Sequence, residues 1–468
     1  MLRPRGEALG SGWRIAYLRA IRAAPNANVA AELPRAASNR KETMSIVVMK
    51  FGGTSLADAN KIRSAARRAI RSQKQGHQVV MVVSAMGKTT DQLEGMARQV
   101  MRGTAAPKRE MDQLLATGEQ VTISLTAMAL EEMGAAAISF TAGQIGIITD
   151  DKHTRARIKT IDARRIHEQL DAGRIVIVTG FQGVTERGHV TTLGRGGSNV
   201  TLVALAVALG AEVCENYTDV DGIFTADPRI VPNARKINKV SYDEMLELAS
   251  LGAGVLHNRA IEFAKKYNVP IHVRSSMNNK KGTMIVAESE SMERIVVSGV
   301  ALKDKLARIS LHNVPDQPGM AAHIFHTLAT HNVVVDDIIQ TVGEDGTAAV
   351  SFTADPGDLD DARVACEKLA TTLKCDVVYE DHLAKVSVVG VGMRTHTGVA
   401  EKMFAALAHA KINIQNITTS EIKISCLIDR AQGAAALRVV HDAFELGGRK
   451  KPARKTRKNR PGKAGKKK

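Results

Sequence analysis

Residues 46–55 read IVVMKFGGTS, a short apolar run that ends in a lysine and two adjacent glycines. β-Branched residues favour a strand, and Gly52 and Gly53 lack a Cβ, so backbone N–H groups there can approach phosphate oxygens closely. Lys50 adds a compact positive charge at the strand end. The run therefore predicts a strand followed by a phosphate-binding turn, and a solvent-exposed lysine at a strand end is the plainer alternative.

Short β-branched runs of this kind recur up to about residue 286, and helical stretches alternate with them. The expected strands cover 79–83, 175–179, 213–217 and 271–273, and the expected helices cover 61–74, 112–132, 162–172 and 199–209. Such alternation predicts an α/β domain built on a largely parallel sheet. The helix over 162–172 is expected at the surface. The helix over 199–209 is apolar on nearly all sides and is expected in the core.

A second glycine-rich stretch, TTLGRGGSN at 191–199, leads into that apolar helix. The planar fork of Arg195 suits a carboxylate. Ser198 and Asn199 stand where an N-cap belongs, so free N–H groups there can hold an anion, whereas an ordinary N-cap would explain Ser198 alone. Gly87-Lys88-Thr89 does not complete a Walker motif, because Val82 stands where its first glycine would be needed. Gly194-x-Gly196 does not complete a Rossmann fingerprint, because Asn199 stands where a small residue would be needed.

Two carboxylates follow the strand expected over 213–217. Asp219 and Asp221, in the sequence TDVDG, could orient a Mg-nucleotide or bind its ribose, and an Asp-Gly turn with local hydrogen bonds explains them equally well. Arg229, in the sequence DPR, adds a guanidinium suited to phosphate. The group as a whole favours a nucleotide.

Beyond residue 298 the sequence repeats itself at an offset of 79 residues. The ungapped matches pair Gly319, Ala321, Phe325, Leu328, Ala329 and Ile338 with Gly398, Ala400, Phe404, Leu407, Ala408 and Ile417. Each unit reads strand, glycine loop, helix, strand, strand, with closing helices over 358–372 and 431–446, as in a ferredoxin-like unit. Neither unit offers a nucleophile with a base, so a duplicated small-molecule sensor is favoured.

The formal net charge of +17 comes from the two ends of the chain. Residues 1–43 hold 8 basic and 3 acidic residues, and residues 449–468 hold 12 basic residues and no acid, which leaves 45 of each between them. The folded body is therefore near neutral, and with 3% aromatic residues it gives little support to nucleic-acid binding. Both ends are expected to be disordered, the first as an arm or a product of an upstream start codon.

Four cysteines, Cys214, Cys366, Cys375 and Cys426, show no metal-ligand spacing, so reduced thiols in a cytoplasmic protein are expected. The longest apolar stretch, 200–209, is about half the length of a membrane span. No transmembrane segment or membrane partner is expected. The N-terminal region also lacks the apolar centre of a secretory signal.

Seven motifs, in order, resemble those of the aspartate kinases. They are KFGGTS at 50–55, VVSAMG at 82–87, LLATGE at 114–119, GFQG at 180–183, TTLGRGGSN at 191–199, YTDVDGIFTADPRIVPNARK at 217–236 and MLELASLGAGVLH at 245–257. The resemblance implies an amino-acid-kinase fold, a mostly parallel sheet sandwiched by helices, over 44–290. Two ferredoxin-like ACT domains would follow over 298–380 and 383–447, with basic extensions at 1–43 and 448–468.

The resemblance implies transfer of the γ-phosphoryl group of ATP to the β-carboxylate of L-aspartate. The product would be 4-phospho-L-aspartate, on the route to lysine, threonine and methionine. Lys50 and Arg195 are the implied catalytic residues. ATP, with Mg²⁺ bound through its phosphates and no protein metal site, would contact Lys50, Phe51, Gly52, Gly53, Thr218, Asp219, Phe224, Arg229, Gly254 and Val255. Aspartate would contact Thr90, Glu119, Arg195, Ser198 and Asn199, with Arg195 on the α-carboxylate and Glu119 on the α-ammonium.

The implied chemistry needs no general base, because an aspartate side chain with a pKa of about 3.9 is already ionised at neutral pH. Asn199 stands where the family motif GRGGSD has aspartate, which predicts weaker aspartate binding. Gly254 stands where many members have lysine, and Phe224 where tyrosine is common. Val334 replaces a usual asparagine, and Thr397 replaces the proline usual before the next glycine.

Regulation is implied as well, with lysine, threonine or both as feedback effectors of a homodimer or higher oligomer that pairs through the ACT domains. The implied effector residues are Asp316, Gln340, Asn413, Ile414, Ser420 and Glu421, although Asn-Ile before a strand could equally belong to a turn or the core. Two other function classes stay open. One is a catalytically weakened amino-acid sensor, and the other is a nucleic-acid-associated protein driven by the basic tails.

Overall fold

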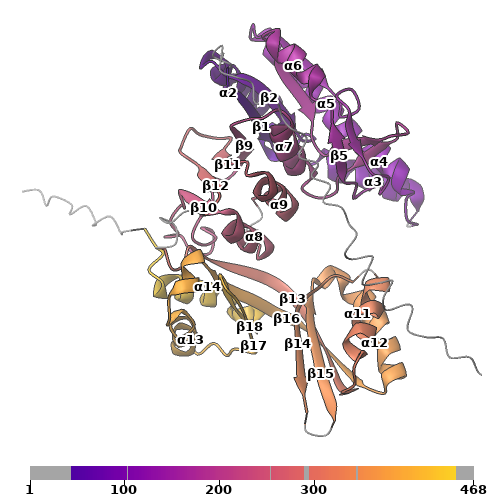
Figure 1. The fold of residues 1–468 in the computed structure, drawn as a ribbon, viewed down its shortest axis with the longest axis vertical. Coiled ribbons are helices and arrows are strands. Elements are labelled where there is room, and N and C mark those ends of the chain that lie inside the picture. The colour runs from indigo at the N-terminus through magenta and orange to yellow at the C-terminus, as the bar shows by residue number, and fades with distance from the viewer. Residues whose placement is uncertain are drawn as a thin grey trace, which may run out of the picture. The chain divides into compact units, whose positions relative to one another are not determined.

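The computed structural model describes residues 44–102, 104–252, 255–288, 295–331, 333–343 and 346–448 (Figure 1). The basic extensions over 1–43 and 449–468 lie outside these ranges, as does Gly254. None of the helices within the ranges combines the length and the apolar character needed to span a membrane.

An eight-stranded sheet forms the first part of the described chain, in the order β10-β12-β11-β9-β1-β2-β6-β3. Its strands are β1 (Ile46–Phe51), β2 (Gln78–Val83), β3 (Ala137–Phe140), β6 (Ile175–Thr179), β9 (Val213–Thr218), β10 (Lys239–Ser241), β11 (Ile271–Ser275) and β12 (Thr283–Val286). All neighbouring pairs are parallel except β11 with β12. The largely parallel sheet expected from the sequence is confirmed.

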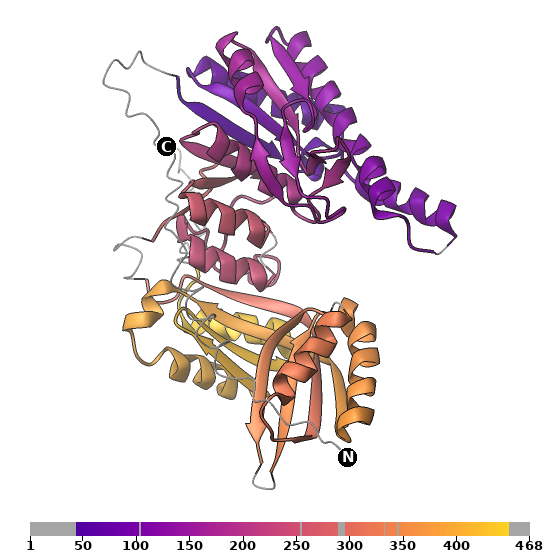
Figure 2. The ribbon, with the colours of Figure 1, turned by 45° about the vertical axis from the view of Figure 1, so that its right-hand side comes forward.

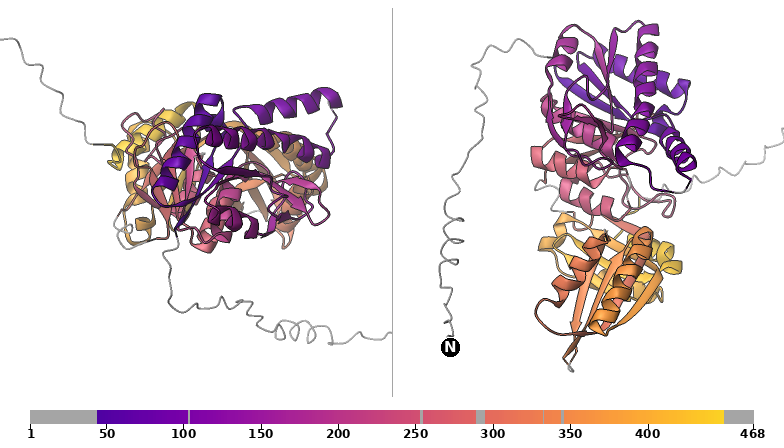
Figure 3. Two further views of the ribbon diagram at one scale, coloured as in Figure 1. Left: turned by 90° about the horizontal axis from the view of Figure 1, so that it is seen from above. Right: turned by 90° about the vertical axis from the view of Figure 1, so that its right-hand side faces the viewer.

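Helices cover both faces of this sheet (Figure 3). The side chains of Val47, Met49 and Phe51 join a core with α2 (Ala59–Lys74) and α5 (Thr117–Glu132). Val48 points to the other face, where it joins a core with α7 (Gly197–Ala208), α8 (Tyr242–Ser250) and α9 (Asn258–Tyr267). Helix α7 is buried from Gly197 to Ala206, as its composition predicts. Helix α6 (Arg164–Asp171) lies at the surface and turns Ile166 and Leu170 inward.

The single helix expected over 112–132 is wrong. The chain forms α4 (Lys108–Leu115) and α5, with a break at Ala116. The carbonyl of Ala116 accepts a hydrogen bond from the side chain of Gln182 at 2.7 Å. Gly118 follows the break, and a Cβ there would lie only 2.8 Å from the Cβ of Ala85. The break therefore starts a new helix against the loop after β2, and α3 (Thr89–Met101) begins at the end of that loop.

A small sheet in the order β5-β4-β7-β8 was not foreseen from the sequence. Its strands are β4 (Ile147–Thr149), β5 (Ile158–Ile161), β7 (Gln182–Thr185) and β8 (Val190–Thr192). Strand β8 leads directly into the GRGGSN loop.

The second part of the chain is a six-stranded sheet in the order β14-β15-β13-β16-β18-β17 (Figure 2). Its elements are β13 (Gly299–Pro315), α11 (Met320–Thr330), β14 (Val335–Val342), β15 (Thr347–Ala354), α12 (Leu359–Leu373), β16 (Asp376–Val389), α13 (Val399–His409), β17 (Asn416–Ser420), β18 (Lys423–Asp429) and α14 (Gly433–Ala443). Gly319 and Gly398 are the left-handed N-caps of α11 and α13, and Leu328 and Leu407 are equivalent core residues. The internal repeat therefore corresponds to two βαββα units.

The two units share their long central strands. Residues 306–312 of β13 pair with 376–383 of β16, within the first unit. Residues 299–303 pair with 385–389, so the start of β13 belongs to the sheet of the second unit.

Candidate active site

The carboxyl ends of the central strands meet at one edge of the large sheet. The N–H of Ser84 donates to the carbonyl of Phe51 (3.2 Å), and the N–H of Gly180 donates to that of Val83 (2.9 Å). The N–H of Gly52 approaches the carbonyl of Tyr217 at 3.4 Å. Ligands of open α/β sheets bind outside the carboxyl ends of the strands. This edge is therefore the candidate active site.

Lys50 lies at this edge and is not a solvent-exposed lysine. Burial lowers the pKa of its ammonium to about 8, and the charge of Asp219 opposes the shift. Within the described ranges no carboxylate forms an ion pair with Lys50. Gly52 lies next to the ammonium, since a Cβ there would be in van der Waals contact with Nζ at 3.4 Å, and Gly53 cannot carry a Cβ because that atom would lie 2.7 Å from the carbonyl oxygen of Ala85. A partly desolvated, unpaired cation beside two glycines fits a nucleotide phosphate.

Glu119 is the acidic counterpart at the same edge, and it lies in the first turn of α5. Its side chain is buried, with Oε1 accepting from the N–H of Ala85 (3.0 Å) and Oε2 accepting from Gln182 Nε2 (3.1 Å). Burial raises its pKa to about 7, and these hydrogen bonds oppose the shift. Among the described residues no cation pairs with this carboxylate, so it fits an incoming ammonium group.

The start of α7 reaches the loop after β2. The hydroxyl of Ser84 donates to that of Ser198 at 2.9 Å, and a Cβ on Gly180 would lie 2.7 Å from the same Ser198 oxygen. Asn199 is buried, and its Oδ1 has no hydrogen-bond partner in the described part of the chain. A buried acceptor without a partner is costly, which fits a site that receives a donor from a ligand. Thr90 lies half-buried in the first turn of α3.

Arg195 is exposed, and within the described ranges its guanidinium makes no hydrogen bond or ion pair. The loop that carries it packs tightly against α9, because a Cβ on Gly196 (φ 73°) would lie 2.3 Å from that of His257. Burial lowers the pKa of His257, and the charges of Arg259 and Arg195 add to the shift. Arg259 in turn donates to the carbonyl of Leu193 at 2.6 Å. The loop is thus held at both ends, while the Arg195 head group is free to bind an anion.

The two carboxylates of TDVDG have different surroundings. Asp221 accepts from Lys280 and from Asn278, both at 2.7 Å, so it stabilises a local turn. Asp219 is exposed and accepts a hydrogen bond from the hydroxyl of Thr218 at 3.1 Å. Its negative charge raises the pKa of Lys50 and so favours the charged ammonium. Only Asp219 is therefore placed to face a nucleotide.

Other residues expected to bind the nucleotide are placed less directly. Arg229 is exposed and forms a forked pair with Asp227 at 2.7–3.1 Å, so a phosphate would have to compete for it. Phe224 is half-buried and its backbone bridges to Lys236. The carbonyl of Val255 accepts from the side chain of Asn216 at 3.4 Å.

Phe51 is fully buried, and its ring stacks on Tyr217 with centroids 4.7 Å apart. The ring lies on the face of the sheet opposite Lys50, since strand neighbours alternate. Only the backbone of Phe51 is therefore left to contact a nucleotide. Within the described residues no group of three or more His, Cys, Asp or Glu is placed to hold a metal ion.

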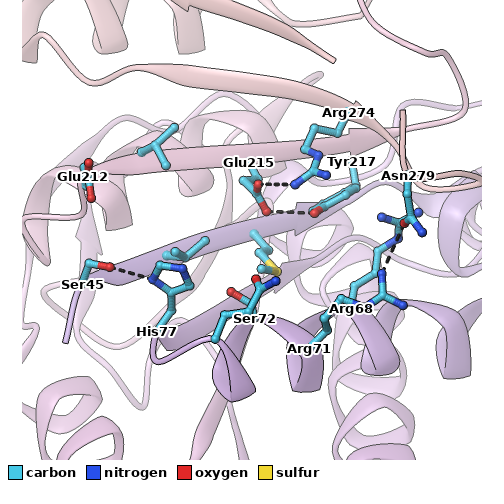
Figure 4. A pocket seen from close by; sticks show the side chains of 14 residues that line it. Ser45, Arg68, Arg71, Ser72, His77, Glu212, Glu215, Tyr217, Arg274 and Asn279 are labelled. Carbon is cyan, nitrogen blue, oxygen red and sulfur yellow. Dashed lines mark hydrogen bonds and ion pairs between the residues drawn. The ribbon is translucent and has the colours of Figure 1, made fainter. Parts of the chain in front are cut away.

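A cavity of about 400 Å³ on that opposite face is not the candidate site (Figure 4). Its cations are already paired. Arg274 Nη1 lies 2.7 Å from Glu215 Oε1, and Arg68 Nη2 donates to the carbonyl of Asn278 at 2.6 Å. The side chains that line the cavity therefore hold β11 and the loop after it in place.

Two residues with direct contacts to the site were not singled out from the sequence, Ser84 and Gln182. Both stand inside motifs that carry the resemblance, VVSAMG and GFQG, so their position in those motifs was the available signal.

Comparisons with known proteins agree with the fold. Residues 45–275 match the amino acid kinase family, and residues 308–370 and 386–444 match ACT domains. Aspartokinase 2 of Bacillus subtilis (strain 168) is 50% identical over 404 residues, which cover 86% of this chain and 98% of that protein. The aspartokinase of Mycolicibacterium smegmatis is 49% identical over 415 residues, covering 86% and 97%.

Solved structures are similar as well. The crystal structure of E. coli aspartokinase III in complex with aspartate and ADP has a TM-score of 0.73 at 27% identity, covering 85% of this chain and 99% of that one. The structure of the same enzyme in complex with lysine and aspartate has a TM-score of 0.69 at 27% identity, with the same coverage.

Proposed function

Since the chain belongs to the aspartokinases of the amino acid kinase family, it transfers the γ-phosphoryl group of ATP to the β-carboxylate of L-aspartate, and we propose that Lys50, Glu119 and Arg195 carry the transfer. The observation that supports this assignment is a half-buried ammonium, Lys50, and a buried carboxylate, Glu119, that lie at one sheet edge and lack ion-pair partners among the described residues. The product is 4-phospho-L-aspartate, the first intermediate toward lysine, threonine and methionine.

Two anions must meet in line for this reaction, so positive charge and alignment supply the catalysis. Lys50 binds the transferred phosphoryl group from its position beside the two glycines, where the low dielectric strengthens its charge. ATP enters with Mg²⁺ on its phosphates, which supplies further positive charge. In this proposal the residues that orient the nucleotide are Gly52, Gly53, Thr218 and Asp219, with further contacts from Phe224, Arg229, Gly254 and Val255.

Aspartate is held by its amino-acid head group in this proposal. Arg195 binds the α-carboxylate, and Glu119 binds the α-ammonium together with the free oxygen of Asn199. Thr90 and Ser198 complete the pocket. Its β-carboxylate, ionised at neutral pH, attacks without a general base.

A catalytically weakened sensor is not favoured. A partly desolvated ammonium and a buried carboxylate without ion-pair partners among the described residues both cost stability, and a protein that had lost catalysis would have no reason to keep them.

We expect kcat/KM for aspartate to follow a bell-shaped pH profile with apparent pKa values of about 7 and about 8. Below the lower value Glu119 takes up a proton and loses its attraction for the ammonium. Above the upper value Lys50 loses its proton and its charge. Steady-state kinetics across this range test the assignment, and a flat profile between pH 6 and 9, roughly, would contradict it.

Restoring the family carboxylate, Asn199→Asp, should lower the KM for aspartate about tenfold, because a charged acceptor binds an ammonium more tightly than an amide does. The KM for ATP should stay unchanged. An unchanged KM for aspartate in the variant would show that Asn199 does not contact the α-ammonium group of aspartate.

The proposal extends to feedback control by lysine, threonine or both. Hydrogen bonds link the second ACT unit to the stretch 217–236, which is proposed to bind the nucleotide. The hydroxyl of Thr225 lies 3.0 Å from Nε2 of the buried His441, and the N–H of Val300 donates to the Thr225 carbonyl at 2.7 Å. A shift of α14 or β13 would therefore reach the residue beside Phe224.

The proposed effector residues fall in two groups. Asp316 directly follows β13 and Gln340 lies on β14, whereas Asn413 and Ile414 precede β17 and Ser420 and Glu421 lie at its end. Strands β14 and β17 are the two edges of the six-stranded sheet, and open edges invite pairing with a second chain. This arrangement supports a homodimer through the ACT domains. Glu421 already pairs with Arg394 at 3.3 Å, so an effector ammonium would have to replace that partner.

Kinase assays with added lysine, threonine and both test the regulation. Inhibition under at least one of these conditions is expected, and an unchanged rate under all three would contradict the proposed regulation.

We also place the chain in the cytoplasm, because its four cysteines are all buried and unpaired, as in a reducing compartment.

A further inference from the structure

Asp112 is a fully buried carboxylate on α4, separate from the residues proposed to bind ATP or aspartate. Its Oδ1 accepts from the hydroxyl of Thr192 (2.5 Å) and lies 3.0 Å from the N–H of Thr154. Its Oδ2 lies 2.7 Å from Nδ1 of His153 and 3.0 Å from the same Thr154 N–H. One carboxylate thus joins three segments: α4, the loop before β5 and strand β8.

The loop that Asp112 holds is strained. Thr154 has a φ of 69°, which a β-branched residue adopts only where its surroundings enforce it. The hydrogen bonds from its N–H to Asp112 are the enforcing contacts. On the other side, the Thr154 carbonyl packs onto Gly194 so closely that a Cβ there would lie 2.9 Å from its oxygen. The next residue after Gly194 is Arg195.

The same carboxylate is tied to the opposite end of the pocket. Only Ala116 separates the end of α4 from the first turn of α5, which carries Glu119. Gln182 holds this junction by donating to both Ala116 and Glu119. Asp112 therefore connects the element that presents Glu119 with the strand and loop that present Arg195.

We propose that Asp112 is a positioning residue for aspartate, which fixes the spacing between Glu119 and the Arg195 loop. It touches neither substrate and acts through the backbone of residues 154 and 192–194. The inference rests on the proposed roles of Glu119 and Arg195. A tie of this kind matters because a misplacement of about 1 Å in a binding group can cost about 100-fold in rate.

Neighbouring threonines on β8 provide a matched test. Thr192→Val removes one hydrogen bond to Asp112, whereas Thr191→Val removes an equally buried hydroxyl that pairs with Thr149 at 2.7 Å. We expect Thr192→Val to raise the KM for aspartate about tenfold, with the KM for ATP within about twofold. Thr191→Val should lower the melting temperature similarly and leave both KM values unchanged.

Asp112→Ala should raise the KM for aspartate about 100-fold, and adding Thr192→Val to it should have little further effect, because removal of the carboxylate already breaks the contact with Thr192. Equal rises of both KM values, or the same KM shift in Thr191→Val, would overturn the proposal. If Asp112→Ala does not fold, the two threonine variants still decide it. Failure of the pocket itself is distinguishable, because Arg195→Gln would then leave the KM for aspartate unchanged.

Discussion

Lys50→Met is expected to lower kcat about 10³-fold and at the same time to stabilise the fold. The loss of activity follows because the charge that meets the transferred phosphoryl group is gone, and removing one preorganised electrostatic contact typically costs 10²–10³. Stability should rise by about 2 kcal/mol at neutral pH. Burial depresses the pKa of Lys50 to about 8, so its charged form is unfavourable in the fold, and methionine avoids that cost.

Lys74→Met, at the exposed end of α2, is the matched control and should change neither quantity. Coupled measurement of ADP release gives kcat, and urea unfolding gives the free energy of unfolding. A variant that kept its activity, or that lost activity only because it was less stable, would show that Lys50 has no direct part in the transfer.

Arg195→Gln should raise the KM for aspartate about 100-fold and leave the KM for ATP nearly unchanged, since a charged hydrogen-bonded pair is worth up to about 3 kcal/mol. The variant should unfold at the same temperature as the parent, because Arg195 is exposed and makes no contact with the described residues that would stabilise the fold.

A substrate analogue sharpens this prediction. β-Alanine is aspartate without its α-carboxylate, so the parent should bind it far more weakly than aspartate. In Arg195→Gln that difference should largely disappear. Arg187→Gln, which removes an exposed arginine from the turn between β7 and β8, is the control. Retained discrimination against β-alanine in Arg195→Gln would assign the α-carboxylate to another group.

The long strands and the buried helix could be predicted because their patterns are strong. Strand β1 is an apolar run followed by two glycines, and helix α7 is an apolar run preceded by glycines. The strand ends and the helix begins at the sheet edge where Lys50 and Ser198 lie. Strands β4 and β5 were missed because they are three and four residues long, too short for an alternation to stand out. The break at Ala116 depends on Gln182, which is far away in the sequence.

Side-chain roles were harder to predict than elements. Phe51 follows Lys50, and alternation along a strand already implied that their side chains point to opposite faces. Arg229 has an acid two residues before it, which takes up its guanidinium. Asp112 had no signal at all, because a buried carboxylate inside a polar helix looks like a surface residue until its three partners are known.

The most direct test of the central assignment is a crystal structure of this chain with ADP and aspartate. The account predicts Nζ of Lys50 within about 3 Å of the β-phosphate and a forked contact between Arg195 and the α-carboxylate of aspartate, with Glu119 on the ammonium. Ligands bound away from the carboxyl ends of β1, β2 and β9, or an aspartate turned so that its α-carboxylate contacts Lys50, would contradict it.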